Sequence, residues 1–181
     1  MAQEELVVLL DERFDPVGTA PKRTVHDAHT PLHLAFSCYV FDRAGRVLLT
    51  RRAIGKKTWP GVWTNSFCGH PGPGEDMAEA IARRAKQELG LEVTGLRKVL
   101  PDFRYTAMDA GGVVENEFCP VWVAEADADP LPEPDEVCEW RWSAWTDLVE
   151  SMSRTPFVFS PWSQLQVPRL AETLSAGATQ R

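Results

Sequence analysis

The stretch that decides the fold is residues 69–91, which read GHPGPGEDMAEAIARRAKQELGL. Its second part predicts a helix over residues 75–89, because apolar side chains recur at offsets of three, four, seven and eleven positions and share one face. These side chains are Ala78, Ile81, Ala82, Ala85 and Leu89. Gly90 follows as the stop, since glycine readily takes the left-handed conformation in which helices end.

On either side of this helix the pattern indicates strands before it and strands and helices after it. Strand-like runs are expected at residues 6–10, 33–41, 47–50, 113–126 and 139–142. Further helices are expected at residues 143–150 and 161–174. Residues 11–31, which are polar and contain prolines, are expected to hold no regular element, and residues 127–136 form an acidic, proline-rich connection. This order predicts an α/β (α+β) chain in which a mixed β-sheet sandwich is flanked by helices.

The bulk composition is that of a packed globular protein. The 181 residues, 44% of them hydrophobic and 25% charged, suit a single domain over residues 1–181, with a flexible tail at residues 175–181. A net charge of −7 argues against nonspecific binding to nucleic acid, which depends on neutralising phosphates. A small phosphorylated substrate is still allowed, but it requires a local basic cluster or a divalent cation.

The cysteines indicate a reducing compartment. Cys38, Cys68, Cys119 and Cys138 form no C-x-x-C pair, and the acidic Glu4 and Glu5 precede a short apolar run, the wrong charge order for a signal peptide. No apolar run approaches the ~20 residues that span a bilayer. A cytoplasmic protein without a membrane partner is therefore expected, and its oligomeric state is left open.

One group of residues has the chemistry of a metal site, and its members are His26, His33, His70, Glu115 and Glu117. The two glutamates are two positions apart in a predicted strand, so their carboxylates point to the same face. Such neighbours are unfavourable unless a cation neutralises them, although a solvated outer face is the commoner explanation for the pair taken alone. Mixed imidazole and carboxylate ligands would suit Mn²⁺, Zn²⁺ or Mg²⁺.

Residues 69–91 resemble a degenerate Nudix box, whose pattern is G-x5-E-x7-R-E-U-x-E-E-x-G-U with U a bulky apolar residue. The matching positions are Gly69, Glu75, Arg83, Glu88 and Gly90. Arg84 and Gln87 stand at positions where the family has glutamates, and Ala85 is small for its apolar position. In Nudix hydrolases these glutamates gather the metal ions that activate water. The departures therefore favour phosphate binding without water activation.

The stretch Thr64–Pro71, TNSFCGHP, closely resembles the matching segment of type I isopentenyl diphosphate isomerases, which belong to the Nudix superfamily. Further segments follow in that family's order: residues 32–37, 51–53, 56–57, 103–105, 115–117 and 159–162. The resemblance covers residues 6–162 and implies a Nudix-like core over about residues 30–165.

The resemblance implies a role for each matching residue. His26, His33, His70, Glu115 and Glu117 would bind one divalent ion, and Cys68 and Glu117 would transfer protons. Glu88 and the main-chain oxygen of Cys68 would help to hold a Mg²⁺ ion that enters with the diphosphate. The oxygens of the diphosphate would be met by Lys22, Arg52, Lys56 and Arg84. Lys57 and Arg83 are assigned to solvated surface.

The reaction itself supports this set of residues. Moving an unactivated double bond by one position adds a proton at one carbon and removes one from another, through a tertiary carbocation. An acid and a base on opposite sides of a dry cleft are needed, and an aromatic face can stabilise the cation. Trp162 is the candidate for that face and Tyr105 for a hydroxyl donor or proton relay. Which of Cys68 and Glu117 adds the proton is left open.

Two other functions remain open from the sequence. The chain could be a Nudix hydrolase of nucleoside or isoprenoid diphosphates, because fold alone does not choose between the reactions. It could also be a noncatalytic phosphate-binding module built around a metal. Arg84 and Gln87, together with the presence of Cys68 and Glu117, favour the isomerase.

Overall fold

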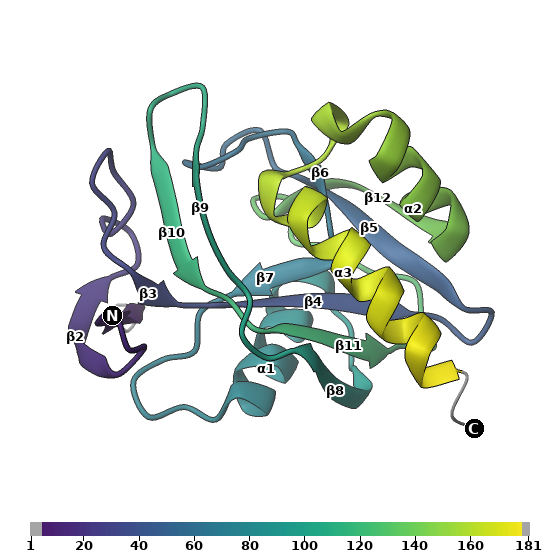
Figure 1. Ribbon diagram of the computed structural model, residues 1–181, viewed down its shortest axis with the longest axis horizontal. Helices are drawn as coiled ribbons and strands as arrows, with labels where there is room; N and C mark the ends of the chain where they lie inside the picture. Colours follow the sequence, from purple (N-terminus) through teal and green to yellow (C-terminus); the bar gives the residue numbers. More distant parts are fainter. Residues whose placement is uncertain (1–4, 179–181) are drawn as a thin grey trace.

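The computed structural model describes residues 5–178, which form two sheets and three α-helices (Figure 1). The larger sheet contains β4 (Phe36–Phe41), β5 (Arg46–Arg52), β6 (Trp63–Thr64), β7 (Phe67–Gly69), β8 (Thr94–Leu100), β11 (Val121–Glu125) and β12 (Val137–Ala144). Its order is β12-β5-β4-β11-β8, with β6 paired to β5 and β7 to β4. The smaller sheet contains β1 (Leu6–Leu10), β2 (Pro16–Pro21), β3 (His33–Leu34), β9 (Arg104–Met108) and β10 (Val114–Phe118). Its order is β2-β1-β3-β10-β9.

Helices cover both faces of the larger sheet because its strands are apolar on both sides. The helices are α1 (Met77–Leu89), α2 (Trp145–Arg154) and α3 (Pro161–Ala178), with a short 3-10 helix, η1 (Pro156–Val158). Tyr39 belongs to the core beneath α2 and α3, whereas its neighbours Cys38 and Val40 belong to the core beneath α1. In Figure 1, α3 crosses one face of this sheet and α1 lies behind the other. The predicted fold class, a mixed sheet flanked by helices, is confirmed.

Two neighbouring segments, residues 33–41 and 114–125, each pass from the smaller sheet into the larger one. The predicted strand at residues 33–41 is divided at Ala35 into β3 and β4, and the one at residues 113–126 is divided at Cys119 and Pro120 into β10 and β11. β10 runs parallel to β3, and β11 runs parallel to β4. The prediction of one continuous strand in each place is wrong, because alternation of side chains does not reveal where a strand changes partners.

Residues 11–31 are not free of regular structure, contrary to the prediction. β2 lies within them and pairs antiparallel with β1. Its two prolines, Pro16 and Pro21, stand at its ends, and β2 is the edge of the smaller sheet. A proline is tolerated there because an edge strand needs no donor on its open side.

The other differences concern elements with weak local patterns. β8 and β9 were not predicted: most residues of β8 are exposed, and β9 alternates between exposed and more buried positions over only five residues. α2 begins at Trp145 and ends at Arg154, later than predicted at both ends, and α3 continues to Ala178 instead of ending at residue 174. Residues 127–136 are irregular, as predicted. Part of the predicted flexible tail, residues 179–181, lies outside the described residues.

The helix α1 has the predicted core face and a second buried line. Ile81, Ala85 and Leu89 are fully buried, but Ala82 is exposed, so the predicted stripe is wrong at that position. Arg84 and Glu88, four positions apart, are buried instead. Burial of charged side chains on a helix requires partners, and these two residues are partners of each other.

Both ends of α1 are closed by caps. The side chain of Asp76 accepts hydrogen bonds from the main-chain nitrogens of Ala78 and Glu79, at 2.8 and 3.3 Å. Gly90 adopts the left-handed conformation, with φ of 64°, and its N–H donates to Lys86. The helix therefore starts two residues later than predicted, since Glu75 stays outside it and binds Arg83.

No helix within residues 5–178 combines the length and the apolar character required to cross a membrane.

The Asp76 cap gives a stability prediction. We expect Asp76→Ala to lower the free energy of unfolding by about 1 kcal/mol, because it removes the acceptor for two N–H groups of the first turn. Asp76→Asn retains a side-chain oxygen and should lose much less. Urea denaturation of the three proteins provides the measurement, and equal losses in both variants would contradict the capping role.

Candidate functional site

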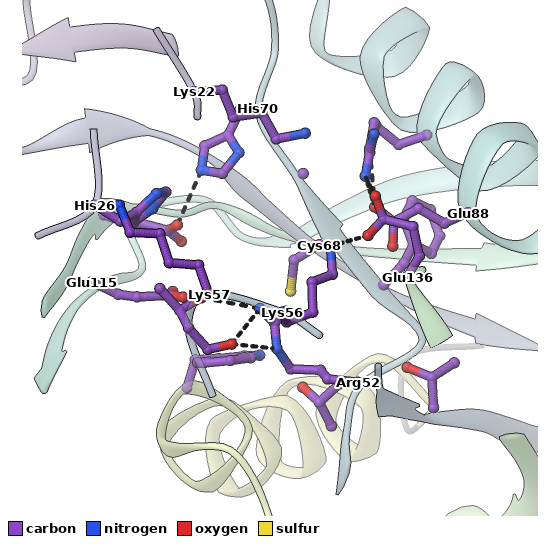
Figure 2. Close-up of a pocket in the computed structure, with 18 of the residues that line it drawn as sticks. Lys22, His26, Arg52, Lys56, Lys57, Cys68, His70, Glu88, Glu115 and Glu136 are labelled. Atoms are coloured by element: carbon purple, nitrogen blue, oxygen red, sulfur yellow. Dashed lines mark hydrogen bonds and ion pairs between the residues drawn. The ribbon is translucent and has the colours of Figure 1, made fainter. Parts of the chain in front are cut away.

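A cavity of about 720 Å³ opens where the two sheets meet (Figure 2). Nearly all residues that the sequence selected line it: Lys22, His26, Arg52, Lys56, Cys68, His70, Arg84, Glu88, Tyr105, Glu115, Glu117 and Trp162. In Figure 2, Cys68 lies between His26 and His70 on one side and Glu88 and Glu136 on the other. The remaining residue, His33, is fully buried behind His70 and contacts it.

The imidazoles and one carboxylate form a compact group. His26, His33, His70 and Glu117 each offer a ligand atom, and these atoms lie within 4.8 Å of one another. The Nε2 atoms of His33 and His70 are 3.2 Å apart, and the Nε2 of His70 lies 3.2 Å from a Glu117 oxygen. Nitrogen and carboxylate atoms facing one centre at these distances are typical of a cation site.

Hydrogen bonds orient the rings of this group and leave some of their nitrogens without a partner. The Nδ1 of His33 donates to the Pro31 carbonyl at 2.9 Å, which orients the ring so that Nε2 faces the centre. The Nε2 of His26 is buried and has no hydrogen-bond partner among the described residues. Burial lowers the pKa of His26 and of His70 to about 4, so both rings stay neutral and keep a lone pair. The group therefore fits a divalent cation.

Glu115 and Glu117 both point into the cavity from β10, as their spacing predicted. Both are buried, so the alternative of a solvated outer face is wrong. The hydroxyl of Tyr105 lies 2.5 Å from a Glu115 oxygen and 3.0 Å from a Glu117 oxygen. Glu115 is not among the four clustered ligand residues; its carboxylate is held by Tyr105. Burial opposes ionisation of Glu117, but hydrogen bonds from His33 and His70 outweigh it and hold its pKa well below the usual value.

Cys68 lies on β7, with its thiol held between two polar side chains. Its Sγ is 3.4 Å from the Ser37 hydroxyl and 3.3 Å from the Asn65 amide oxygen. Burial raises the pKa of the thiol to about 12. The thiol therefore keeps its proton, while Glu117 is ionised.

Asn65 is a residue whose role the sequence analysis missed. Its Nδ2 donates to the carbonyls of Cys38 and Phe67, at 3.0 and 2.7 Å, and this fixes the direction of Oδ1. That oxygen accepts hydrogen bonds from the Cys68 thiol and, at 2.9 Å, from Nε1 of Trp162. The only signal in the sequence was its place inside the quoted stretch at residues 64–71.

Trp162 forms an aromatic wall of the cavity. Its ring centroid lies 5.7 Å from that of Tyr105, and the Arg52 guanidinium lies 5.5 Å from its ring. The ring is almost fully buried, so it also packs in the core. The two roles are compatible because the ring also lines the cavity.

The basic side chains converge on the opposite side, and three of them are paired with carboxylates. Lys22 binds Glu5 at 2.6 Å, Lys56 binds Glu136, and Arg84 binds both Glu88 and Glu136. Lys57, assigned to the surface by the sequence analysis, also lines the cavity. Glu5 and Glu136 were missed, since neither stands in a periodic pattern.

Arg52 contacts no carboxylate among the described ion pairs and is held by the main chain and a hydroxyl instead. Its guanidinium donates to the carbonyl and the hydroxyl of Thr58, at 2.9 and 3.0 Å. These bonds fasten the loop that carries Lys56 and Lys57. Arg52 therefore points its charge into the cavity from a fixed position.

The fold and this site are those of a Nudix protein. The model of the NUDIX domain family matches residues 31–163. Among solved structures, DR0079 from Deinococcus radiodurans superposes with a TM-score of 0.71 at 19% identity, covering 92% of this chain and 99% of that one. A MutT NUDIX hydrolase from Burkholderia pseudomallei gives a TM-score of 0.59 at 21% identity, covering 76% and 97% of the two chains. At these low sequence identities, the two structures support the fold alone.

Sequence relatives define the family more narrowly. An isopentenyl-diphosphate Delta-isomerase of Clavibacter michiganensis is 59% identical, with 96% of this chain and 95% of the relative covered. One of Kocuria rhizophila is also 59% identical, with 94% and 96% covered. The chain belongs to the isopentenyl-diphosphate Delta-isomerase family.

The histidine group gives a prediction about metal binding. We expect His26→Ala to weaken Mn²⁺ binding, because it removes one of the clustered nitrogens. Loss of a residue that merely orients a ligand costs roughly ten- to hundredfold in affinity, so loss of a ligand should cost at least as much. His29→Ala is the matched control, since His29 is exposed and outside the group. Titration with Mn²⁺, followed by electron paramagnetic resonance, measures both. Equal affinity in the two variants would remove His26 from the site.

Proposed function

We propose that this chain converts isopentenyl diphosphate to dimethylallyl diphosphate, as the names of its relatives indicate for those proteins. One observation carries the proposal. A protonated thiol, Cys68, and an ionised carboxylate, Glu117, line the same cavity as a converging set of basic side chains. Such a cavity provides both a proton donor and a proton acceptor beside an anion site, which is what a double-bond shift in a diphosphate ester requires.

The reaction balances without any oxidant or reductant. A proton adds to the terminal methylene carbon, and the double-bond electrons form that C–H bond, leaving a tertiary carbocation. A second proton then leaves the carbon next to the methylene-oxy group, and its bonding electrons form the new double bond. Cys68 and Glu117 are the two proton-transfer groups, and Tyr105 connects to Glu117 as a hydroxyl donor or relay.

Trp162 is proposed to stabilise the carbocation. The ring lines the cavity, and its quadrupole attracts a cation that lies over its face. Asn65 keeps the indole N–H occupied at the ring edge, so the orientation of the ring is fixed. Exclusion of water by the surrounding buried residues protects the cation from capture.

The histidine group is proposed to hold Mn²⁺, Zn²⁺ or Mg²⁺. His26, His33, His70 and Glu117 would bind it, with Glu115 as a further ligand after a small movement away from Tyr105. A divalent ion there would neutralise the buried carboxylates and hold them in place. Around it, Tyr105 continues to orient Glu117.

The diphosphate is proposed to bind at the basic side. Lys22, Arg52, Lys56 and Arg84 offer charge-assisted donors there. A Mg²⁺ ion that enters with the diphosphate would be held by Glu88 and the main-chain oxygen of Cys68. We place the reaction in the cytoplasm, because Cys68 and the other cysteines are free and must stay reduced.

Diphosphate hydrolysis is the competing reaction. It needs several carboxylates that gather metal ions around a water molecule. Here Arg84 stands in the buried line of α1 and binds Glu88, so a fixed cation takes the place of a ligand. This arrangement favours isomerisation.

The proposed function is tested with isopentenyl diphosphate and Mg²⁺. We expect dimethylallyl diphosphate as the product, no release of phosphate, and loss of activity on exhaustive chelation that Mg²⁺ or Mn²⁺ restores. Nuclear magnetic resonance identifies the product, and a colorimetric assay detects phosphate. Release of phosphate without isomerisation would support a hydrolase instead.

The role of Cys68 gives a separate prediction. We expect Cys68→Ala to lower turnover by about a hundred- to ten-thousand-fold while the bound metal stays in place, because alanine removes the thiol but keeps the main-chain oxygen. Cys138→Ala is the control, since Cys138 is exposed and does not line the cavity.

Deuterium uptake from heavy water into substrate and product, together with elemental analysis, separates the two effects of Cys68→Ala. A variant with normal metal content and the wild-type rate of exchange would show that Cys68 carries no proton.

A further inference from the structure

The carboxylate of Glu136 reaches into the basic side of the cavity and pairs with two of the cations assigned to the diphosphate. One of its oxygens binds the Lys56 ammonium, and the other lies 3.3 Å from the Arg84 guanidinium. Both oxygens are therefore engaged with cations. An anion that needs Lys56 and Arg84 must compete with a carboxylate that already holds them.

Main-chain hydrogen bonds fix Glu136 in this position. Its carbonyl accepts from Ala53 at 3.0 Å, and Ala53 in turn accepts from the main-chain nitrogen of Lys56 at 3.2 Å. Three residues earlier, the nitrogen of Glu133 donates to the Glu88 carbonyl at 2.8 Å, which ties the same segment to α1. The end of the acidic connection at residues 127–136 is thus built between the two elements that supply the cations.

The cavity is lined by almost equal numbers of basic and acidic side chains. Its basic lining residues are Lys22, Arg23, Arg52, Lys56, Lys57 and Arg84. Its acidic lining residues are Glu5, Glu88, Glu115, Glu117 and Glu136. The positive and negative charges of these two sets nearly cancel. The cavity therefore attracts a diphosphate strongly only where a carboxylate moves away from its basic partner.

We propose that Glu136 is an internal counter-ion of the anion site, which holds Lys56 and Arg84 in the ligand-free protein and is displaced from them by the diphosphate. A diphosphate offers more charge and more acceptor oxygens than one carboxylate, so it takes over both cations. Glu136 is then a positioning residue that sets how tightly the anion binds. The inference rests on the proposed function only in that the cavity takes a diphosphate.

The test is the affinity for inorganic diphosphate in the presence of Mg²⁺, measured by isothermal titration calorimetry at low salt. We expect Glu136→Gln to lower the dissociation constant by about three- to tenfold, the range set by loss of two partly exposed ion pairs. The difference should shrink at high salt, because screening weakens both pairs. An unchanged or higher dissociation constant in Glu136→Gln would overturn the inference.

Glu139→Gln is the matched control. Glu139 lies on the neighbouring strand β12 and pairs with Arg51 at 2.6 Å, but neither residue lines the cavity. The same change of charge there should leave the dissociation constant as in the wild type. An equal tightening in both variants would assign the effect to net charge and also overturn the inference.

A second variant keeps the test valid if Glu136→Gln folds poorly, which thermal unfolding would detect. Glu136→Asp keeps the charge but is one methylene shorter, so it loses reach to one cation and should give an intermediate dissociation constant. A value at or above that of the wild type would overturn the inference.

The outcome is separable from the proposed function. If Glu136→Gln binds inorganic diphosphate more tightly but the wild-type protein does not isomerise isopentenyl diphosphate, the counter-ion role stands and the proposed isomerase function is wrong. If the wild-type protein isomerises isopentenyl diphosphate but Glu136→Gln binds diphosphate no more tightly, the isomerase function stands and the counter-ion role is wrong. Absence of binding in both proteins overturns the counter-ion role.

Discussion

The site depends on the place where two parallel segments change sheets together. The main-chain nitrogen of Ala35 donates to the Phe118 carbonyl at 2.9 Å, and that of Ser37 donates to the Pro120 carbonyl at 3.2 Å. The two segments therefore pass from one sheet to the other together. Just before the crossing, His33 and Glu117 are register partners of parallel strands. After it, Ser37 pairs with Cys68. One backbone constraint therefore brings the histidine group and the thiol into the same cavity.

Around this junction the buried polar side chains are fixed by one another. Asn65 directs its oxygen at Cys68 and Trp162, and Ser37 receives a further hydrogen bond from Gln166 at 2.9 Å. A buried polar group without a partner is costly, so each bond restricts the side chain to one orientation. Cys68 and Trp162 are thereby held in fixed positions. In the proposed reaction, this reduces the entropic cost of bringing them into the reactive geometry.

The opposite side of the cavity is organised by charge. Carboxylates pair with Lys22, Lys56 and Arg84. The buried pair of Arg84 and Glu88 shows why, because neither charge is stable in the interior without the other. These ion pairs hold the basic side chains in place, and the proposed counter-ion role of Glu136 makes anion binding an exchange of partners. In a chain with a net charge of −7, such a local cluster is the means by which an anionic ligand is met.

Local sequence patterns determined much of the fold and most of the candidate site. The helix at residues 77–89 has its own caps and periodic core face, and the alternation of Glu115 and Glu117 placed two carboxylates on one side of a strand. The ordered resemblance to a known family selected twelve residues that line the cavity. These features depend on neighbours close in the chain, or on motifs long enough to be specific, so the sequence alone carries them.

Tertiary structure decided the rest. β2 forms because β1 offers it an edge, and the strands at Ala35 and Cys119 divide because their pairing partners change. Glu136 contacts Lys56 and Arg84, which are distant from it in sequence, and Asn65 joins its near neighbour Cys68 to the distant Trp162. No periodicity or spacing records such contacts, because they arise from packing between elements and not from the conformation of any one segment.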